Sequence, residues 1–299
     1  MTVNNIKTVG FIGLGQMGWP MASRLAAAGF ALVIQDADPV RMNDFCKQVN
    51  GLIKVAESDS AWAEVDALIT MLPNSKIVEK VLLDSGVARQ LRPGTLLIDM
   101  SSSEPICTRS LATTLRESGL AFIDAPVSGG VKGAVAGTLA VMVGGEIEDL
   151  ERARDLLDCI GKNIFHVGQA GAGHAAKALN NYVSAATLLI TVEALHAAEE
   201  FGIDPLMMTD VLNASSGRSN TTENKVKQFM LSGTYGSGFS LKLMAKDVRI
   251  AMNLIEAQRQ LAPLGRSSLT VWEQGASVAD AGTDHTEMYA LLSGKDKIK

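Results

Sequence analysis

Three glycines near the amino terminus have the spacing of a loop that holds a dinucleotide. Gly13, Gly15 and Gly18 form a Gly-x-Gly-x-x-Gly pattern, which follows an apolar run at residues 8–12 and precedes a helical pattern that starts at residue 19. In such a loop the first glycine allows a tight turn, the second lets the backbone approach a pyrophosphate, and the third lets the helix pack closely on the strand. The helix also points unpaired N–H groups at the phosphates. The residues that we expect to bind a dinucleotide here are Gly13, Leu14, Gly15, Gln16, Met17 and Gly18.

Asp36 is the residue that we expect to discriminate NAD from NADP. It follows an expected strand at residues 31–35, where an acidic side chain can accept hydrogen bonds from the hydroxyls of the adenine ribose. Its charge would repel a 2′-phosphate, so the sequence favours NAD. Arg41 is close enough in the sequence to accommodate such a phosphate, which leaves NADP open. Asp36 could instead cap the turn that follows it.

A second loop of small residues could bind an anion. Ser128, Gly129 and Gly130 lie just after an expected strand at residues 121–124. Small residues in this position expose successive backbone N–H groups, which can form a concave anion site, and Ser128 adds a hydroxyl donor. A plain turn is the alternative, and the residues alone leave both interpretations open.

Lys177 is a charged residue in an otherwise apolar stretch of the chain. It lies in an apolar helical segment, with His174 three residues before it and Asn181 four residues after it on the same face. An ordinary lysine has a pKa of about 10.4, so it acts as a base near neutral pH only if burial or a nearby positive charge lowers that value. Taken alone, the residue is better explained as a lysine whose charge reaches solvent. A catalytic Lys177 would have to be partly buried.

The first half of the chain alternates strand and helix patterns. Short apolar runs that end at glycine, proline or acidic residues indicate buried strands, and a helix is expected at residues 19–28. This alternation favours a doubly wound, parallel α/β sheet of the Rossmann type. The expected strands are residues 8–12, 31–35, 67–72, 95–99, 121–124 and 139–143.

The second half is expected to be all helical. Apolar residues recur there at helical spacing, in candidate helices at residues 178–201, 239–258 and 269–281. A further helix should begin at Pro205 with Asp204 as its cap. A glycine-rich stretch at residues 167–173 separates the two patterns. We therefore expect a dinucleotide-binding domain at residues 1–166 and an all-α domain for substrate binding and oligomerisation at residues 167–299.

Composition excludes several other classes of protein. The 299 residues carry a formal net charge of −5, and no basic run interleaved with aromatic residues suggests nucleic acid binding. Cys46, Cys107 and Cys159 are too far apart for a metal motif, and plain thiols suit a reducing cytoplasm. The chain shows no signal peptide, and its longest apolar stretch is interrupted by polar residues. We expect a cytoplasmic protein with no metal and no membrane segment.

Five segments together resemble the β-hydroxyacid dehydrogenase family, which includes 3-hydroxyisobutyrate dehydrogenase and tartronate semialdehyde reductase. The resemblance covers essentially the whole chain. The segments are residues 10–18 (GFIGLGQMG), 99–102 (DMSS), 124–130 (DAPVSGG) with Gly133, Ala134 and residues 137–139 (GTL), 171–181 (GAGHAAKALNN), and 243–247 (LMAKD).

The resemblance assigns a role to each matching residue. It makes Lys177 the catalytic acid–base residue, and it makes Ser128, Gly129 and Gly130 the binding site for the substrate carboxylate. Asn181 would bind and orient the substrate, and Asp247 would lie in the same region. The family does not require a histidine at position 174, so we interpret His174 as structural. Near the cofactor, the resemblance places Met71, Leu72, Pro73 and Asn74 at the adenosine and pyrophosphate. It places Ser102, at a position where many relatives carry threonine, at the nicotinamide ribose, and it places Lys246 at the nicotinamide.

The resemblance implies reversible oxidation of a 3-hydroxy acid with NAD or NADP, most like 3-hydroxyisobutyrate dehydrogenase. The segment at residues 215–219 (SSGRS) resembles the hydroxyisobutyrate branch, and Arg218 could pair with a second carboxylate or with a neighbouring acidic residue. A semialdehyde, sugar-acid or imine reductase of the same superfamily is the first alternative, although imine reductases generally lack the lysine. A non-catalytic dinucleotide-binding module is the second.

The resemblance also implies self-association. The helix expected at residues 178–201 is more apolar than one small helical domain needs to bury, and in relatives such helices form contacts between subunits. We expect a homodimer or homotetramer.

Overall fold

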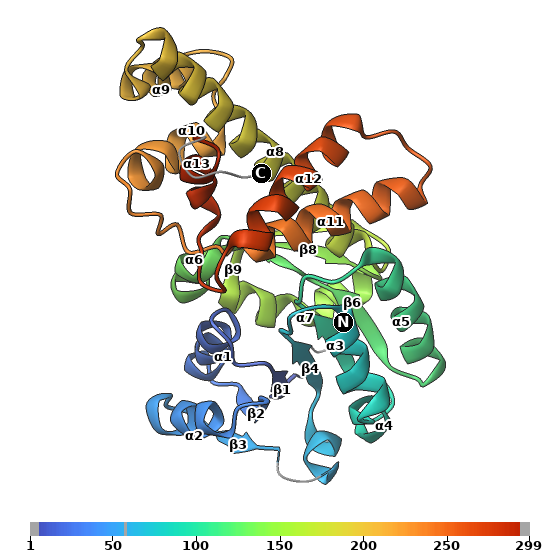
Figure 1. The fold of residues 1–299 in the computed structure, drawn as a ribbon. Helices are drawn as coiled ribbons and strands as arrows, with labels where there is room; N and C mark the ends of the chain where they lie inside the picture. The colour runs from blue at the N-terminus through green and yellow to red at the C-terminus, as the bar shows by residue number, and fades with distance from the viewer. Residues whose placement is uncertain (1–5, 57–58, 294–299) are drawn as a thin grey trace. The chain divides into compact units, whose positions relative to one another are not determined.

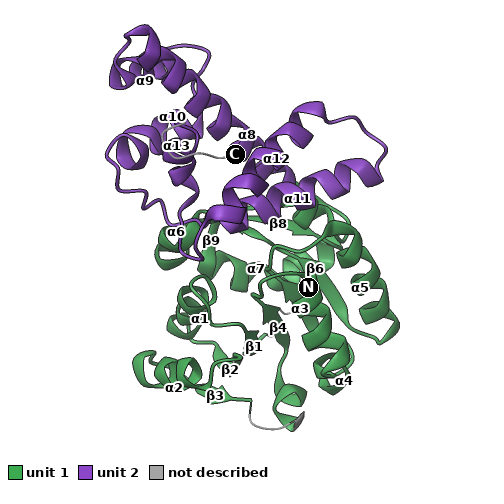
Figure 2. Cartoon of the chain, viewed as in Figure 1, with its two compact units in different colours: residues 1–177 green, residues 178–299 purple. Residues whose placement is uncertain are grey.

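The computed structural model describes residues 6–56 and 59–293, with the elements shown in Figure 1. The chain divides into two compact units, residues 1–177 and 178–299 (Figure 2). The division lies inside helix α8 (Ala172–Phe201), whereas the sequence placed the domain boundary before residue 167. The limits of the two functional domains stay a prediction.

The first unit is built on one twisted sheet with parallel strands at its centre. Six parallel strands lie in the order β3-β2-β1-β4-β5-β6. Their bounds are β1 (Thr8–Ile12), β2 (Ala31–Gln35), β3 (Ile53–Val55), β4 (Ala67–Thr70), β5 (Leu96–Asp99) and β6 (Ala121–Asp124). Because loops that follow parallel strands gather at one edge of the sheet, the residues after β1, β4, β5 and β6 share that edge.

The far side of the sheet departs from the expected parallel pattern. β8 (Leu139–Gly144) runs antiparallel to β6 and to the short β7 (Val127–Ser128), and β9 (Gly161–Gly168) pairs parallel with β8. A parallel neighbour needs a full crossover, but β7 and the short helix α6 (Gly130–Ala136) occupy the chain between β6 and β8. Strand β9 was missed because most of its residues are exposed and its longest apolar run is only Ile164 and Phe165.

Alternate residues of each central strand enter two separate cores. Phe11 and Ile98 belong to the core that includes helices α1 and α7, whereas Leu68 and Leu97 belong to the core that includes α4 and α5. Burial on both faces explains the unbroken apolar runs of these strands. Besides α6 and the first residues of α8, the helical segments of this unit are α1 (Gly18–Ala27), α2 (Pro39–Gln48), η1 (Asp59–Glu64), α3 (Ser75–Glu79), η2 (Lys80–Asp84), α4 (Val87–Gln90), α5 (Pro105–Glu117) and α7 (Ile147–Ile160).

The second unit is helical, as expected. Asp204 accepts hydrogen bonds from the N–H groups of Leu206 and Met207, and Pro205 opens α9, which confirms that capping prediction. Trp272 is fully buried in the core of this unit. The elements are the carboxyl-terminal part of α8, α9 (Pro205–Ala214), α10 (Asn220–Asn224), η3 (Val226–Met230), α11 (Leu241–Ala257), α12 (Pro263–Val278), η4 (His285–Glu287) and α13 (Met288–Leu291).

Helix α12 begins six residues earlier than the sequence indicated, at Pro263 rather than residue 269. Gly265 lies in this extra turn, and a Cβ added there would come within 2.4 Å of the Met252 sulfur on α11. The glycine that weakens the helical pattern therefore permits close packing of two helices. No helix in the described ranges is long and apolar enough to cross a bilayer.

Candidate active site

The glycine loop between β1 and α1 has space for a ligand. Gly13 has a φ of +102°, and a Cβ on Gly18 would lie 1.9 Å from the Gly13 carbonyl oxygen, so both positions require glycine. A Cβ on Gly15, in contrast, would meet no atom within 4 Å. Met17, at the helix N-cap, makes no side-chain capping hydrogen bond to the first turn of α1. The N–H groups and the open space fit a pyrophosphate.

Asp36 ties the end of β2 to the glycine loop. Its carboxylate accepts hydrogen bonds from the N–H of Leu14 at 2.6 Å and from the N–H of Asp38 at 2.9 Å. Arg41 lies 3.4 Å from the same carboxylate and also faces Asp38. The turn contact that the sequence offered as an alternative is therefore present. A role toward the adenine ribose stays a prediction.

The loops after β4 and β5 are held together by serine side chains. The N–H of Leu72 donates to the Ser101 hydroxyl at 2.9 Å, and Asn74 caps α3 through the N–H of Ile77. Ser101 and Ser103 are buried, whereas Ser102 between them is half-buried. The two flanking serines therefore fix the loop, and the residue that the sequence assigned to the nicotinamide ribose is the more exposed of the three.

The loop assigned to the substrate carboxylate joins β7 to α6. Ser128 is the last residue of β7, and Gly129 and Gly130 have φ values of +131° and +62°. Only glycine adopts both conformations without strain. A Cβ on Gly130 would meet no atom within 4 Å, so the backbone is open on that side.

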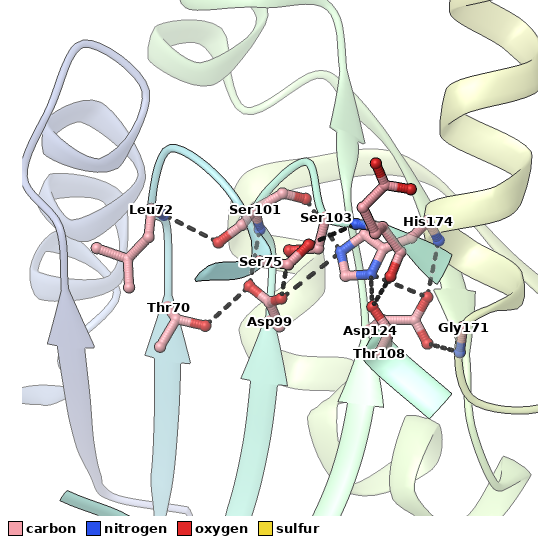
Figure 3. Close-up of polar contacts among 11 residues, drawn as sticks. Thr70, Leu72, Ser75, Asp99, Ser101, Ser103, Thr108, Asp124, Gly171 and His174 are labelled. Carbon is pink, nitrogen blue, oxygen red and sulfur yellow. Dashed lines mark hydrogen bonds and ion pairs between the residues drawn. The ribbon is translucent and has the colours of Figure 1, made fainter. Parts of the chain in front are cut away.

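A buried polar cluster that the sequence did not predict lies at the ends of β5 and β6 (Figure 3). Asp99 ends β5 and accepts hydrogen bonds from Thr70 and Ser103. Asp124 ends β6 and accepts from the N–H of Gly171 at 2.6 Å and of His174 at 2.7 Å. The sequence contains one signal for this cluster, namely that an acidic residue ends each of two neighbouring strands.

Two opposing effects act on the pKa of the Asp124 carboxyl. Its side chain is fully buried, and burial raises the pKa of its carboxyl above the ordinary value, although the His174 ring and the two backbone N–H groups act in the opposite direction. Glycines make the approach of α8 to this carboxylate possible. A Cβ on Gly173 would lie 2.8 Å from one Asp124 oxygen, and a Cβ on Gly144 would lie 2.6 Å from the other.

Helix α8 carries both Lys177 and Asn181, one turn apart. Lys177 is 9% exposed, which is the burial that the sequence analysis requires of a catalytic lysine. In the second unit, the Asn181 amide donates to the Asp247 carboxylate at 2.6 Å, and the Lys246 ammonium lies 3.4 Å from the other Asp247 oxygen. Asp247 is 3% exposed, so Asn181 and Lys246 stabilise a buried charge. The structure thus brings together three of the residues expected at the site.

Arg218 does not contact the Asn181 group among the interactions of the described residues. It lies 3.6 Å from Glu223, with both side chains substantially exposed. Across residues 6–56 and 59–293, no group of three or more His, Cys, Asp or Glu side chains is arranged to hold a metal ion.

Two family models together match nearly the whole chain. Residues 8–168 match the NAD binding domain of 6-phosphogluconate dehydrogenase, and residues 171–292 match the NAD-binding model of NADP-dependent 3-hydroxyisobutyrate dehydrogenase. The chain is 36% identical to mitochondrial 3-hydroxyisobutyrate dehydrogenase of Mus musculus, over 95% of this chain and 86% of that protein. The chain belongs to the β-hydroxyacid dehydrogenase family. It is an NAD(P)-dependent 3-hydroxyacid dehydrogenase.

Other relatives and solved structures resemble this chain over most of its length. The chain is 37% identical to the NAD-dependent L-serine dehydrogenase of Pseudomonas aeruginosa, over 89% of this chain and 91% of that protein. A structure of Mycobacterium tuberculosis 3-hydroxyisobutyrate dehydrogenase with L-serine matches with a TM-score of 0.88 and 34% identity, and covers 95% of this chain and 98% of that one. An imine reductase from Myxococcus stipitatus, at 18% identity and a TM-score of 0.64, shares the fold alone.

Two substitutions in the glycine loop separate binding from folding. Gly15→Ala places a methyl group in open space, so we expect unfolding temperature without cofactor to stay unchanged while the Kd for NAD rises about tenfold or more, equivalent to about 1.4 kcal/mol. Gly18→Ala, which forces a methyl group onto a carbonyl oxygen, should lower the unfolding temperature as well. Thermal scans and NAD titrations measure both; wild-type NAD affinity in Gly15→Ala would contradict the placement of the pyrophosphate.

Proposed function

We propose that this dehydrogenase oxidises a small 3-hydroxy acid with one carboxylate, reversibly, to the corresponding semialdehyde or ketone, with Lys177 as the acid–base residue. The single observation that carries the proposal is the burial of Lys177 on α8, one turn before Asn181. Bound NAD supplies the hydride acceptor. Lys177 takes the proton from the substrate hydroxyl during oxidation and returns it during reduction.

The backbone after β7 supports binding of the substrate carboxylate. Ser128, Gly129 and Gly130 offer a hydroxyl and N–H groups on a segment that positive φ angles turn sharply. A carboxylate bound there would fix one end of the substrate. Fixing that end restricts the position of the hydroxyl group, which is how an enzyme avoids an entropic cost in the reacting complex.

Asn181 supports the orientation of the same substrate. One hydrogen of its amide is directed to Asp247, which fixes the amide plane and leaves the other amide hydrogen to donate to substrate. Lys246 at 3.4 Å partly compensates the Asp247 charge. We propose that Asn181 contacts the substrate and that Asp247 acts by holding Asn181, while Lys246 lies toward the nicotinamide end of the cofactor.

The exposed pairing of Arg218 with Glu223 favours a substrate with a single carboxylate. Arg218 is already paired with an acidic residue, so its position does not favour a dicarboxylic substrate. Two relatives are named for monocarboxylic 3-hydroxy acids, 3-hydroxyisobutyrate and L-serine, whereas a third, from Eubacterium barkeri, is named for the dicarboxylic 2-(hydroxymethyl)glutarate. We propose 3-hydroxyisobutyrate first and L-serine second, ahead of sugar acids.

Lys177→Ala should lower kcat by about 10²- to 10⁴-fold, the usual contribution of a positioned acid–base group, while NAD affinity stays unchanged. Steady-state kinetics with 3-hydroxyisobutyrate and L-serine, together with NAD titration, measure the two effects. Lys162→Ala, an exposed lysine on β9, is the matched control. An unchanged kcat in Lys177→Ala would refute the assignment of Lys177.

Cofactor preference gives a separate prediction. We propose that Asp36 favours NAD, because its carboxylate would repel a 2′-phosphate. Asp36→Asn removes the charge but keeps an oxygen for the Leu14 N–H, so the ratio of kcat/KM for NAD to that for NADP should fall about tenfold or more, as expected for the loss of a like-charge repulsion of about 1.4 kcal/mol. Arg41→Ala tests the opposing contribution. A ratio that Asp36→Asn leaves unchanged would exclude this role.

We also propose a homo-oligomer, a dimer or a tetramer, formed through the exposed apolar face of α8. Val183 and Ile190 lie two turns apart on that face and are each 62% exposed, and Phe201 is 84% exposed. Apolar side chains gathered along one helix face favour contact with a second copy. The three cysteines are free, which supports a reducing, cytoplasmic location.

The double substitution Val183→Glu and Ile190→Glu should shift the mass measured by light scattering from a dimer or tetramer toward a monomer. The reason is that both charges would be buried in the contact between copies. Leu52→Glu, at a more exposed apolar position in the first unit, is the control and should leave the mass unchanged. A wild-type protein that is monomeric at micromolar concentration would refute the proposal.

A further inference from the structure

His174 lies at the centre of the buried polar cluster. Its side chain is fully enclosed, and it is surrounded by groups from three elements: Asp99 and the Ser101 carbonyl at the end of β5, Asp124 at the end of β6, and Thr108 on α5 (Figure 3). The Asp99 and Asp124 carboxylates lie 3.7 Å and 3.6 Å from the two ring nitrogens. These groups belong to the first unit, so the cluster is complete within it.

The hydrogen bonds of the imidazole are specific for its two nitrogens. Nε2 lies 3.1 Å from the Ser101 carbonyl oxygen, and because a carbonyl oxygen only accepts, Nε2 carries the hydrogen. Nδ1 lies 2.8 Å from the Thr108 hydroxyl, which also reaches the Glu104 carbonyl at 3.0 Å. The ring therefore connects the loop that leads to Ser102 with helix α5.

The backbone of the same residue fixes the start of α8. The first N–H groups of a helix have no partners within the helix. Here the N–H groups of Gly171 and His174 donate to Asp124, so a carboxylate from β6 takes the place of an N-cap side chain. Lys177 follows His174 by three residues on the same continuous helix. A shift of this first turn would therefore move Lys177.

We propose that His174 is a positioning residue for the dehydrogenase reaction. Its ring bond to the Ser101 carbonyl and its backbone bond to Asp124 join the loop that carries Ser102 to the turn of α8 that carries Lys177. His174 thus sets the position of the lysine relative to the loop after β5, without touching the reacting atoms. The kinetic part of this inference rests on the proposed role of Lys177; the structural part does not.

Two near-isosteric substitutions distinguish the two sides of the ring. His174→Gln keeps a donor near the position of Nε2 and can retain the bond to Ser101, whereas His174→Asn keeps a polar atom only near Nδ1 and loses that bond. We expect kcat of His174→Gln to stay within about threefold of wild type, and kcat of His174→Asn to fall roughly tenfold to hundredfold, because misplacement of a catalytic group by about 1 Å costs that much. NAD affinity should change little in both.

A deuterium isotope effect separates positioning from stability. With 3-hydroxyisobutyrate deuterated at the oxidised carbon, His174→Asn should show a larger isotope effect on kcat than wild type, at a temperature well below its unfolding temperature. A residue that only stabilises the fold would lower the unfolding temperature and leave the isotope effect unchanged. His166→Asn is the matched control, since it also removes a bond from Nε2 to a backbone carbonyl, that of Gly145, and it should leave the isotope effect unchanged.

Amide hydrogen exchange tests the same inference without substrate. His174→Asn should speed exchange of the Gly171 and His174-position amides in the first turn of α8, and His174→Gln should not. If the wild-type enzyme does not turn over the hydroxy acid, the proposed substrate is refuted, but the hydrogen-exchange comparison still tests the role of His174. Equal effects of Asn and Gln on kcat and on exchange would overturn the role of His174.

Discussion

The bond between the Asp124 carboxylate and the first turn of α8 is the constraint on which the site depends. A carboxylate at a helix amino terminus is favoured by the helix dipole by about 0.3–1 kcal/mol, and by up to about 2 kcal/mol where it is partly buried. Here it replaces the missing N-cap side chain of Gly171, through two N–H groups. The position of Lys177 follows, because a continuous helix transmits the placement of its first turn.

Hydrogen bonds from backbone N–H groups to acidic side chains also hold other loops of the first unit. Acidic residues terminate three strands: Asp36 follows β2, Asp99 ends β5 and Asp124 ends β6. Asp36 and Asp124 accept backbone N–H groups from other segments of the chain, whereas Asp99 accepts the N–H of Ser101 in its own loop, so charge-assisted hydrogen bonds hold these loops. The glycine loop is open at Gly15, where a pyrophosphate would need to approach the backbone. Parallel strands make the arrangement possible, since their carboxyl ends meet at one edge.

Membership of the β-hydroxyacid dehydrogenase family accounts for the class of reaction, and this chain adds its own details. Relatives named for 3-hydroxyisobutyrate, for L-serine and for 2-(hydroxymethyl)glutarate match it almost equally, so membership of the family does not identify the substrate. Two such details are a serine at position 102 and a histidine at position 174. Ser102 lies in the loop after β5, and the His174 ring connects that loop to the helix that carries Lys177.

The sequence by itself determined the dinucleotide fold, the helical second unit and the family, because glycine spacing and apolar periodicity are local properties of the chain. It did not reveal the antiparallel β8 or the exposed β9, since pairing direction depends on how the intervening chain is used. It interpreted His174 as structural and gave no role to Asp99 or to the Asp124 carboxylate. Only the tertiary structure joined these residues, because the groups that surround the ring come from segments 50 to 75 residues away in the chain.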